Sequence, residues 1–154
     1  MKQLYGSYQN RILEDKQYCD EIKVGTGMTE YMYTDRHAYE VVSVEDQKHV
    51  SVRRYDVKKI GEGMTNDWEL ISNENNPVYP MTKRGQYWYW TVTINADILD
   101  ELEAAEGDEK FRIALFLAHN DIDQDKLRQK GKITKYHRAH VSFGTADYHY
   151  DYEF

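Results

Sequence analysis

Over residues 49–55 apolar residues alternate with polar neighbours, which is the pattern of a half-buried β-strand. This and other stretches of the first hundred residues are rich in β-branched and aromatic residues, which favour strands. They cover residues 30–33, 38–44, 49–55, 68–71 and 86–94. The last stretch carries strong β-formers on both faces, so we expect it to be a central strand. A short amphipathic helix is predicted ahead of them, over residues 4–15.

The clearest helical period covers residues 96–106. Its apolar positions recur at intervals of three and four residues, and acidic residues occupy the remaining face. The apolar positions are Ile98, Leu99, Leu102 and Ala105. Asn95 is a suitable N-cap, and Gly107 is a suitable stop. The sequence therefore predicts one clear, acidic helix here.

The remainder of the chain gives weaker signals. The apolar run 111–118 predicts a buried strand, with a helix as the alternative. Residues 123–130 predict one or two helical turns that end at Gly131. The chain is expected to be extended from Ile133, and aromatic and polar residues alternate from Tyr148, which predicts a terminal strand.

These elements predict a mainly β (α+β) domain. We expect a small twisted antiparallel sheet or partly open barrel, with the acidic helix of residues 96–106 packed against it. The chain shows no repeat, low-complexity tract or linker rich in Pro, Gly or Ser. Residues 1–154 are therefore expected to form a single domain.

Charge is unevenly distributed along the chain. Seven acidic residues and no Lys or Arg lie between residues 97 and 109, which equals the formal net charge of −7. The other 20 acidic residues are balanced by 20 basic ones. Because nucleic-acid binding depends on clustered Lys and Arg, we do not expect direct binding to nucleic acids.

Cysteine usage and hydropathy indicate the compartment. The single cysteine, Cys19, allows no intrachain disulfide, which fits a reducing cytoplasm. No apolar run approaches the roughly 20 residues of a membrane helix, and no export signal is recognisable. We therefore expect a cytoplasmic protein without a membrane partner; the sequence leaves its oligomeric state open.

Two candidate metal sites fail on spacing. Asp121, Asp123 and Asp125 alternate as in a calcium loop, but a lysine stands at both the sixth and the twelfth position, so helix capping by aspartate is the better interpretation. A second set of possible ligands is His137, His140 and His149. Residues three apart on a strand point to opposite faces, so no zinc site is expected, although convergence of the three stays open.

No catalytic residue is predicted. His119 stands beside Asn120 and Asp121, but no Ser or Cys nucleophile is identifiably partnered with it. We therefore expect a protein that is not an enzyme and has no cofactor.

The polar connection Asp35-Arg36-His37, followed by Tyr39, is the candidate for ligand binding, because sites often lie on loops between strands. An acid, a guanidinium, an imidazole and tyrosine rings could hold a nucleotide. In the alternative interpretation, Asp35 caps backbone amides and Arg36 is solvated. The numerous tyrosines could stack on bases, anchor a protein partner or simply fill the core.

A TDRHAY-type motif lies at residues 34–39, and VGTGMT precedes it at 24–29. Further along the chain come Gly63-Met64-Thr65, Gly85 to Trp88, and an aromatic, acidic ending from Phe143 to Phe154. Together these segments resemble a group of small, largely uncharacterised proteins of bacteriophages and mobile elements. Residues 95–139 depart from that pattern, and the resemblance implies that they are an insertion that carries the acidic helix.

The resemblance implies a phage-encoded accessory protein in the host bacterial cytoplasm. We expect it to bind and block a host-defence factor, a nucleic-acid-binding effector, by steric occlusion, as an anti-CRISPR protein does. The residues expected to meet the partner are Asp97, Asp100, Glu101, Glu103 and Glu106, with exposed tyrosines as anchors. The first alternative is a sponge or hydrolase for a nucleotide signal that uses the Asp35-Arg36-His37 turn. The second is a phage structural or assembly protein.

Overall fold

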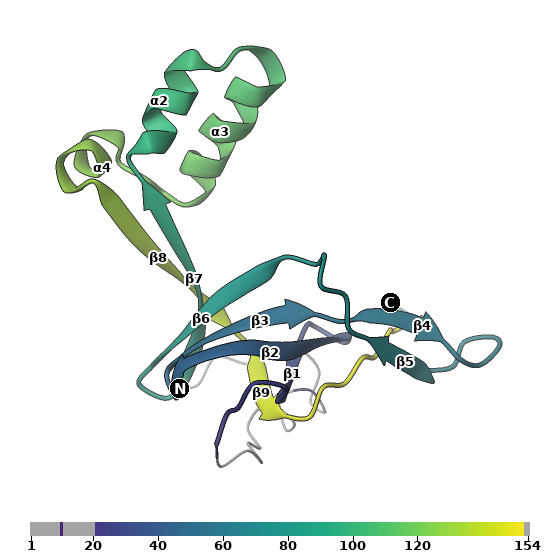
Figure 1. Ribbon diagram of the computed structural model, residues 1–154. Helices are drawn as coiled ribbons and strands as arrows, with labels where there is room; N and C mark the ends of the chain where they lie inside the picture. Colours follow the sequence, from purple (N-terminus) through teal and green to yellow (C-terminus); the bar gives the residue numbers. More distant parts are fainter. Residues whose placement is uncertain (1–9, 11–20, 153–154) are drawn as a thin grey trace. The chain divides into compact units, whose positions relative to one another are not determined.

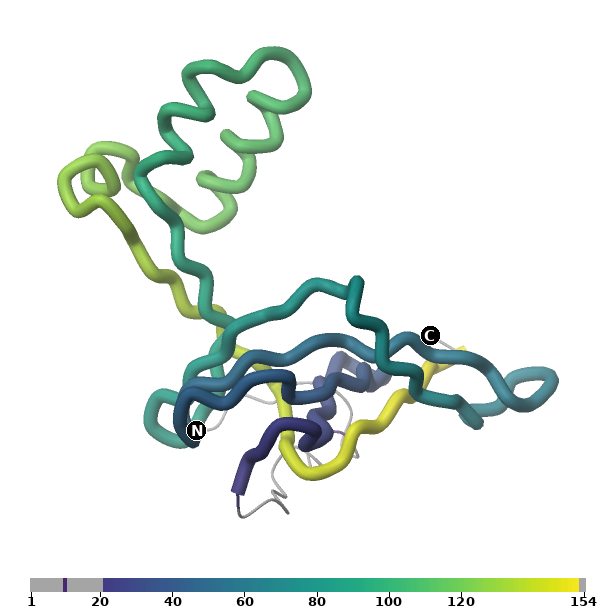
Figure 2. The backbone as a smooth tube through the Cα atoms, in the orientation of Figure 1, coloured from purple at the N-terminus to yellow at the C-terminus, as the bar shows by residue number. Residues whose placement is uncertain are grey.

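The computed structural model describes residue 10 and residues 21–152 (Figure 1, Figure 2). The helix predicted over residues 4–15 lies, apart from Asn10, outside the described residues. The described chain divides into two compact units, and each is treated by itself below. We call the described part of residues 1–90 and 138–154 the sheet unit, and residues 91–137 the helical unit. Whether residues 95–139 are an insertion stays a prediction.

An open antiparallel sheet of seven strands dominates the fold, in the order β8-β7-β6-β3-β2-β1-β9. Its strands are β1 (Gly27–Tyr31), β2 (Arg36–Asp46), β3 (His49–Arg54), β6 (Val78–Arg84), β7 (Tyr87–Asn95), β8 (Lys132–Ala139) and β9 (Val141–Gly144). A second antiparallel sheet pairs β4 (Asp56–Lys59) with β5 (Trp68–Ile71). The α+β fold class predicted from the sequence is confirmed, in its open-sheet form.

One prediction about the strands was wrong, and one strand was not predicted. β7 is not central, because it lies second from the β8 edge. The alternation pattern also does not single out β6, which lies between β3 and β7. Pro80 argues against an interior strand at β6, because proline has no amide hydrogen. In the structure Pro80 nevertheless pairs with Ser51 of β3.

One face of the large sheet carries the main core. Register places Met28 opposite Phe143 and Val50 opposite Met81, so these side chains fall in rows on the same face. The ring of Phe143 lies 4.6 Å from that of Trp88, centroid to centroid. These apolar side chains are therefore used in packing.

The helical unit contains α2 (Asp97–Ala104), α3 (Gly107–His119) and α4 (Gln124–Lys130). Its small core consists of Ile94, Leu99, Leu117 and Leu127. α4 begins and ends as predicted: Asp123 accepts hydrogen bonds from the backbone N–H groups of residues 125 and 126, and Gly131 adopts the left-handed conformation.

Three local predictions in the helical unit were wrong. The run 111–118 belongs to α3 rather than to a buried strand, and only Leu117 of this helix is buried. The residue before α2 is Ala96, without a side-chain cap, so Asn95 is not the N-cap. Gly107 does not stop α2, which ends at Ala104. It is instead the first residue of α3, and its φ of 63° is a left-handed conformation that glycine adopts most readily.

The terminal strand predicted from Tyr148 is also absent from the described residues. A single antiparallel bridge joins His149 to Arg36, and the segment is otherwise irregular. Side chains satisfy its backbone N–H groups instead of a strand: Thr29 accepts from residue 147, Asn66 from Tyr150, and Asp35 from residue 151. The segment therefore needs no neighbouring strand.

A carboxylate network ties the small sheet to the large one. Glu40 on β2 accepts hydrogen bonds from Arg53 on β3 and from Ser72, which follows β5, both at 2.6 Å. Partial burial raises the pKa of the Glu40 carboxyl. Hydrogen bonds from Ser72 and Arg53, together with the Arg53 charge, outweigh that effect and hold the pKa below its usual range.

This network predicts a pH dependence of stability. The pKa of Glu40 is lower in the folded than in the unfolded state. The ionised carboxylate therefore stabilises the fold above the unfolded-state pKa, and this stabilisation is lost as the pH falls through the folded-state pKa. We expect Glu40→Gln to lower the free energy of unfolding at pH 7 and to flatten its fall as the pH drops below about 5. Urea unfolding across this range measures both; parallel pH profiles for the two proteins would contradict the assignment.

Within the described part of the chain, no helix is both long and apolar enough to cross a membrane.

Candidate functional site

The five acidic residues expected to meet the partner divide into two groups in the structure. Asp97, Asp100 and Glu101 are spaced by three and four residues, which places them on one side of the helix. Leu99, which enters the core, lies on another side. All three carboxylates are exposed, and among the described residues none has an ion pair or side-chain hydrogen bond. We call these three residues the acidic face.

The other two predicted partner residues lie elsewhere. Glu103 accepts a hydrogen bond from Arg128 of α4 at 2.9 Å, an ion pair with both side chains at least half exposed. Glu106 lies beyond the end of α2 and directly precedes α3. Both are exposed, but neither extends the acidic face. The structure therefore brings together three of the five predicted residues.

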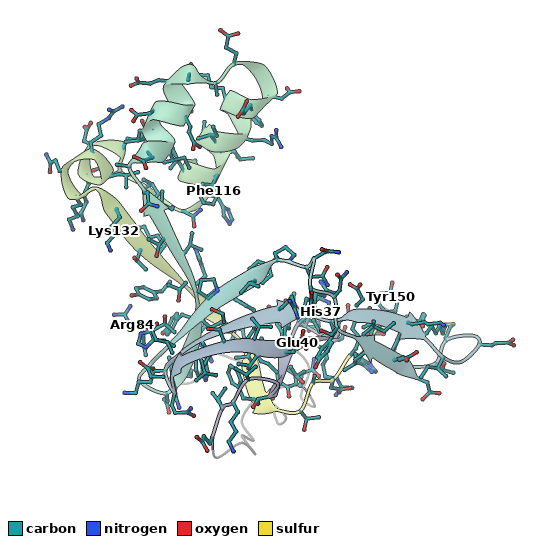
Figure 3. All side chains as sticks on the ribbon, viewed as in Figure 1. His37, Glu40, Arg84, Phe116, Lys132 and Tyr150 are labelled. Atoms are coloured by element: carbon teal, nitrogen blue, oxygen red, sulfur yellow. The ribbon has the colours of Figure 1, made fainter. Side chains whose placement is uncertain are left out.

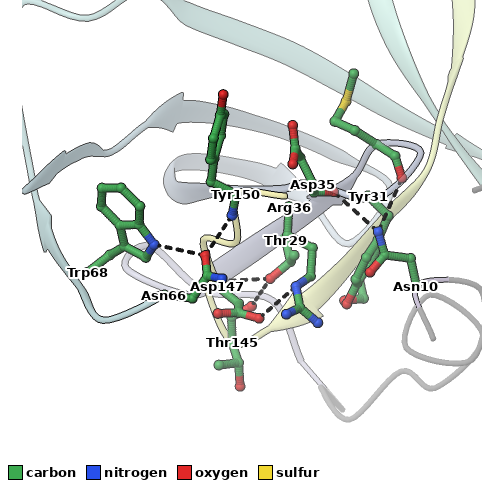
Figure 4. Close-up of polar contacts among 12 residues, drawn as sticks. Asn10, Thr29, Tyr31, Asp35, Arg36, Asn66, Trp68, Thr145, Asp147 and Tyr150 are labelled. Carbon is green, nitrogen blue, oxygen red and sulfur yellow. Dashed lines mark hydrogen bonds and ion pairs between the residues drawn. The ribbon is translucent and has the colours of Figure 1, made fainter. Parts of the chain in front are cut away.

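Asp35 and Arg36 hold the C-terminal segment (Figure 4). The Asp35 Oδ1 atom accepts a hydrogen bond from the residue 151 N–H at 2.6 Å. Arg36 exchanges two backbone hydrogen bonds with His149, and its Nε atom lies 3.1 Å from the Asp147 carboxylate. The Arg36 side chain is only 12% exposed. Asp35 caps a backbone amide as the alternative interpretation expected, whereas Arg36 is not solvated.

His37 and Tyr39 meet a carboxylate that the sequence analysis missed. Glu30 faces His37 in the register of β1 and β2. One of its oxygens lies 3.5 Å from the His37 Nδ1 atom and accepts a hydrogen bond from the Tyr39 hydroxyl at 3.0 Å. Burial and the Glu30 carboxylate raise the pKa of the Tyr39 hydroxyl. The pairing of the two strands was the one signal that could have placed Glu30 here.

Tyrosines of the C-terminal segment pack on the small sheet. The ring of Tyr148 stacks on His37 and meets the edge of Trp68 at 4.8 Å. The Lys59 ammonium donates to the Tyr152 hydroxyl at 2.9 Å and lies 4.9 Å from that ring. Rings that contact one another and a lysine in this way are used for packing, although Tyr150 stays 45% exposed.

Two of the three histidines considered as zinc ligands, His137 and His149, make contacts of other kinds. The His137 Nε2–H donates a hydrogen bond to the Asn120 Oδ1 atom at 2.9 Å, and the His137 ring stacks on His119. His149 belongs to the bridge with Arg36. Among the described residues, no group of three or more His, Cys, Asp or Glu side chains is placed to hold a metal ion.

A scan against models of protein families found no match for this chain, and neither did searches of curated proteins or of solved structures. Function is therefore inferred from the residues and their geometry.

The two candidate sites differ in what their side chains can still contact. Asp35 and Arg36 are engaged with the C-terminal segment, so a ligand at that turn would have to compete with existing contacts. The acidic face is exposed and contains no base to neutralise it. It can attract a positively charged surface over several ångströms at physiological ionic strength.

Proposed function

We propose that the protein binds a basic surface of another protein through the acidic face of α2. The three exposed carboxylates of Asp97, Asp100 and Glu101 on one side of a short helix are the observation that carries this proposal. Asp97 and Glu101 are four residues apart, where like charges destabilise a helix by about 0.2–0.5 kcal/mol. A cationic partner would relieve this repulsion.

The partner we propose is a bacterial defence factor whose own ligand is nucleic acid. Such an effector has a basic groove, and carboxylates spaced along a helix can occupy it in place of phosphates. The protein would then act by steric occlusion, as an anti-CRISPR protein of a phage does. The resemblance to phage and mobile-element proteins supports this choice. The alternatives, a nucleotide-binding protein and a phage assembly component, stay predictions without a specific contact in their favour.

Neutralising the acidic face tests the proposal. The partner is first captured with the full-length tagged protein, identified and purified, and association is then measured at low and moderate salt. We expect the triple variant Asp97→Asn, Asp100→Asn, Glu101→Gln to associate at least about tenfold more slowly at low salt, because electrostatic steering sets the rate of encounter. The salt dependence of the rate should weaken in parallel.

The matched control removes the same net charge from exposed sites outside the helical unit. Glu45, Glu62 and Glu74 are exposed, and their triple replacement with glutamine should leave association nearly unchanged. If both triple variants associate equally slowly, long-range charge alone is responsible and the acidic face is not the interface. If both associate as fast as the wild type, the acidic face plays no part in binding. A functional readout follows from the same set: wild type should raise phage plating on bacteria with the captured defence system, and the acidic-face variant should not.

A further inference from the structure

Helix α3 carries an apolar row that nothing in the helical unit covers. Figure 3 labels Phe116, a residue of the same helix outside this row. Phe111, Ala114, Leu115 and Ala118 recur at intervals of three and four residues, so they lie along one side of the helix. We call these four residues the apolar stripe. All four are exposed, Phe111 to 67% and Leu115 to 56%. An exposed apolar row of this kind marks an interaction surface.

The order of side-chain sizes in the apolar stripe is large, small, large, small. We propose that the stripe is an interface between two copies of the chain, whose α3 helices pack antiparallel about a two-fold axis. Reversing the direction of one helix places Phe111 opposite Ala118 of the other copy and Ala114 opposite Leu115, so each large side chain meets a small one. A parallel pair would place Phe111 against itself and leave gaps at the alanines.

The acidic first turn and the dipole of α3 favour the same orientation. Asp108 and Glu109 lie in its first turn, and its last turn contains no acidic residue. Antiparallel packing brings the acidic first turn of each copy beside the last turn of the other, and it sets the two helix dipoles in opposite directions, which is favourable for neighbouring helices. A parallel pair would place acidic turn beside acidic turn. Size and charge patterns thus select the same partner and the same direction.

The size of the stripe limits the strength of the association. Eight residues of helix extend over about 10 Å, so the buried area falls at the low end for specific interfaces, where complexes are weak and transient. We therefore expect a dimer that forms with a dissociation constant on the order of 100 µM.

Sedimentation of the full-length protein tests the association. Between about 10 µM and about 1 mM, the wild type should shift from monomer to dimer. Leu115→Gln removes a large side chain from the stripe and should weaken association by about tenfold or more. Arg112→Gln is the matched control, because Arg112 is an exposed residue of the same helix outside the stripe. Both replaced residues are exposed, so circular dichroism should show an unchanged fold.

Oxidative cross-linking tests the direction of the helices. Cys19, the only cysteine, is first replaced with serine in all proteins. In the antiparallel register Ala114 lies next to the two-fold axis, offset from its copy by about 1.5 Å along the helix, whereas Ala118 is offset by about 10 Å. A disulfide requires Cα atoms within about 7 Å. Ala114→Cys should therefore form cross-linked dimers, and the matched variant Ala118→Cys should not.

Three results would overturn the proposal. A monomer at every concentration, with the introduced thiol of the Ala114→Cys variant open to a maleimide, would show that the stripe has no second copy as its partner. A monomer in which that thiol resists the reagent would show that the chain covers the stripe itself. Equal cross-linking of the two cysteine variants would reject the antiparallel register.

Discussion

Replacing Gly27 with alanine is expected to displace the C-terminal segment from the large sheet. A Cβ atom at Gly27 would lie 2.4 Å from the backbone N of Ala146 and 2.9 Å from the backbone C of Thr145. Both neighbours are main-chain atoms, so no side-chain rotation relieves the contact. Gly27 also pairs with Gly144 at the end of β9, so relief requires movement of a strand end. We expect a loss of about 3 kcal/mol in the free energy of unfolding.

Tryptophan fluorescence during urea unfolding measures this loss. Trp68, Trp88 and Trp90 are the only tryptophans of the chain, and all three belong to the sheet unit. Gly63→Ala is the matched control: Gly63 has a φ of 72° but nothing within 4 Å of an added Cβ, so only backbone strain of about 1 kcal/mol is expected. Equal losses for the two variants would show that the close approach at Gly27 does not constrain the fold.

Hydrogen exchange locates the effect. In Gly27→Ala, the amides of residues 147, 150 and 151 should exchange faster, because their acceptors are side chains of the sheet unit that the displaced segment leaves behind. The amides of β3 should keep their protection. Uniform loss of protection throughout the sheet would indicate global destabilisation rather than release of the segment.

Local signals in the sequence predicted much of the fold. The β5 strand and the α4 helix follow from patterns within a few residues, such as the Asp123 cap and Gly131. The run 111–118 could not be assigned, because an apolar run of eight residues fits either a buried strand or a helix. The structure adds what the pattern could not show: most of this run is exposed, so its hydrophobicity does not report burial.

The candidate sites show the same limit. Spacing alone groups Asp97, Asp100 and Glu101 on one side of a helix, but the ion pair of Glu103 with Arg128 joins residues 25 positions apart. The turn at Asp35 is tied to residue 151 over 116 positions. Contacts at such separations depend on the path of the whole chain. Sequence reasoning could therefore propose the Asp35 turn as a ligand site but could not see that its side chains hold the C-terminal segment.

Replacing Phe143 with alanine is the second large effect that we expect. Phe143 is 1% exposed and packs against Trp88, Met28 and neighbouring side chains of the main core. Its removal leaves a cavity under the sheet and should lower the free energy of unfolding by about 3–5 kcal/mol, a large share of the total for a domain of this size. Because the substitution also changes the surroundings of Trp88, the urea midpoint rather than the fluorescence intensity measures the loss.

Phe111→Ala is the matched control, because it removes the same atoms from a position that is 67% exposed. We expect it to change stability by no more than about 0.5 kcal/mol. The same variant should weaken the pairing of α3 helices, since Phe111 faces Ala118 of the second copy in the proposed register. A loss of stability without a loss of association in Phe111→Ala would mean that this ring packs within its own chain. A loss of association without a loss of stability would instead show that Phe143 stabilises the fold and that Phe111 joins two copies.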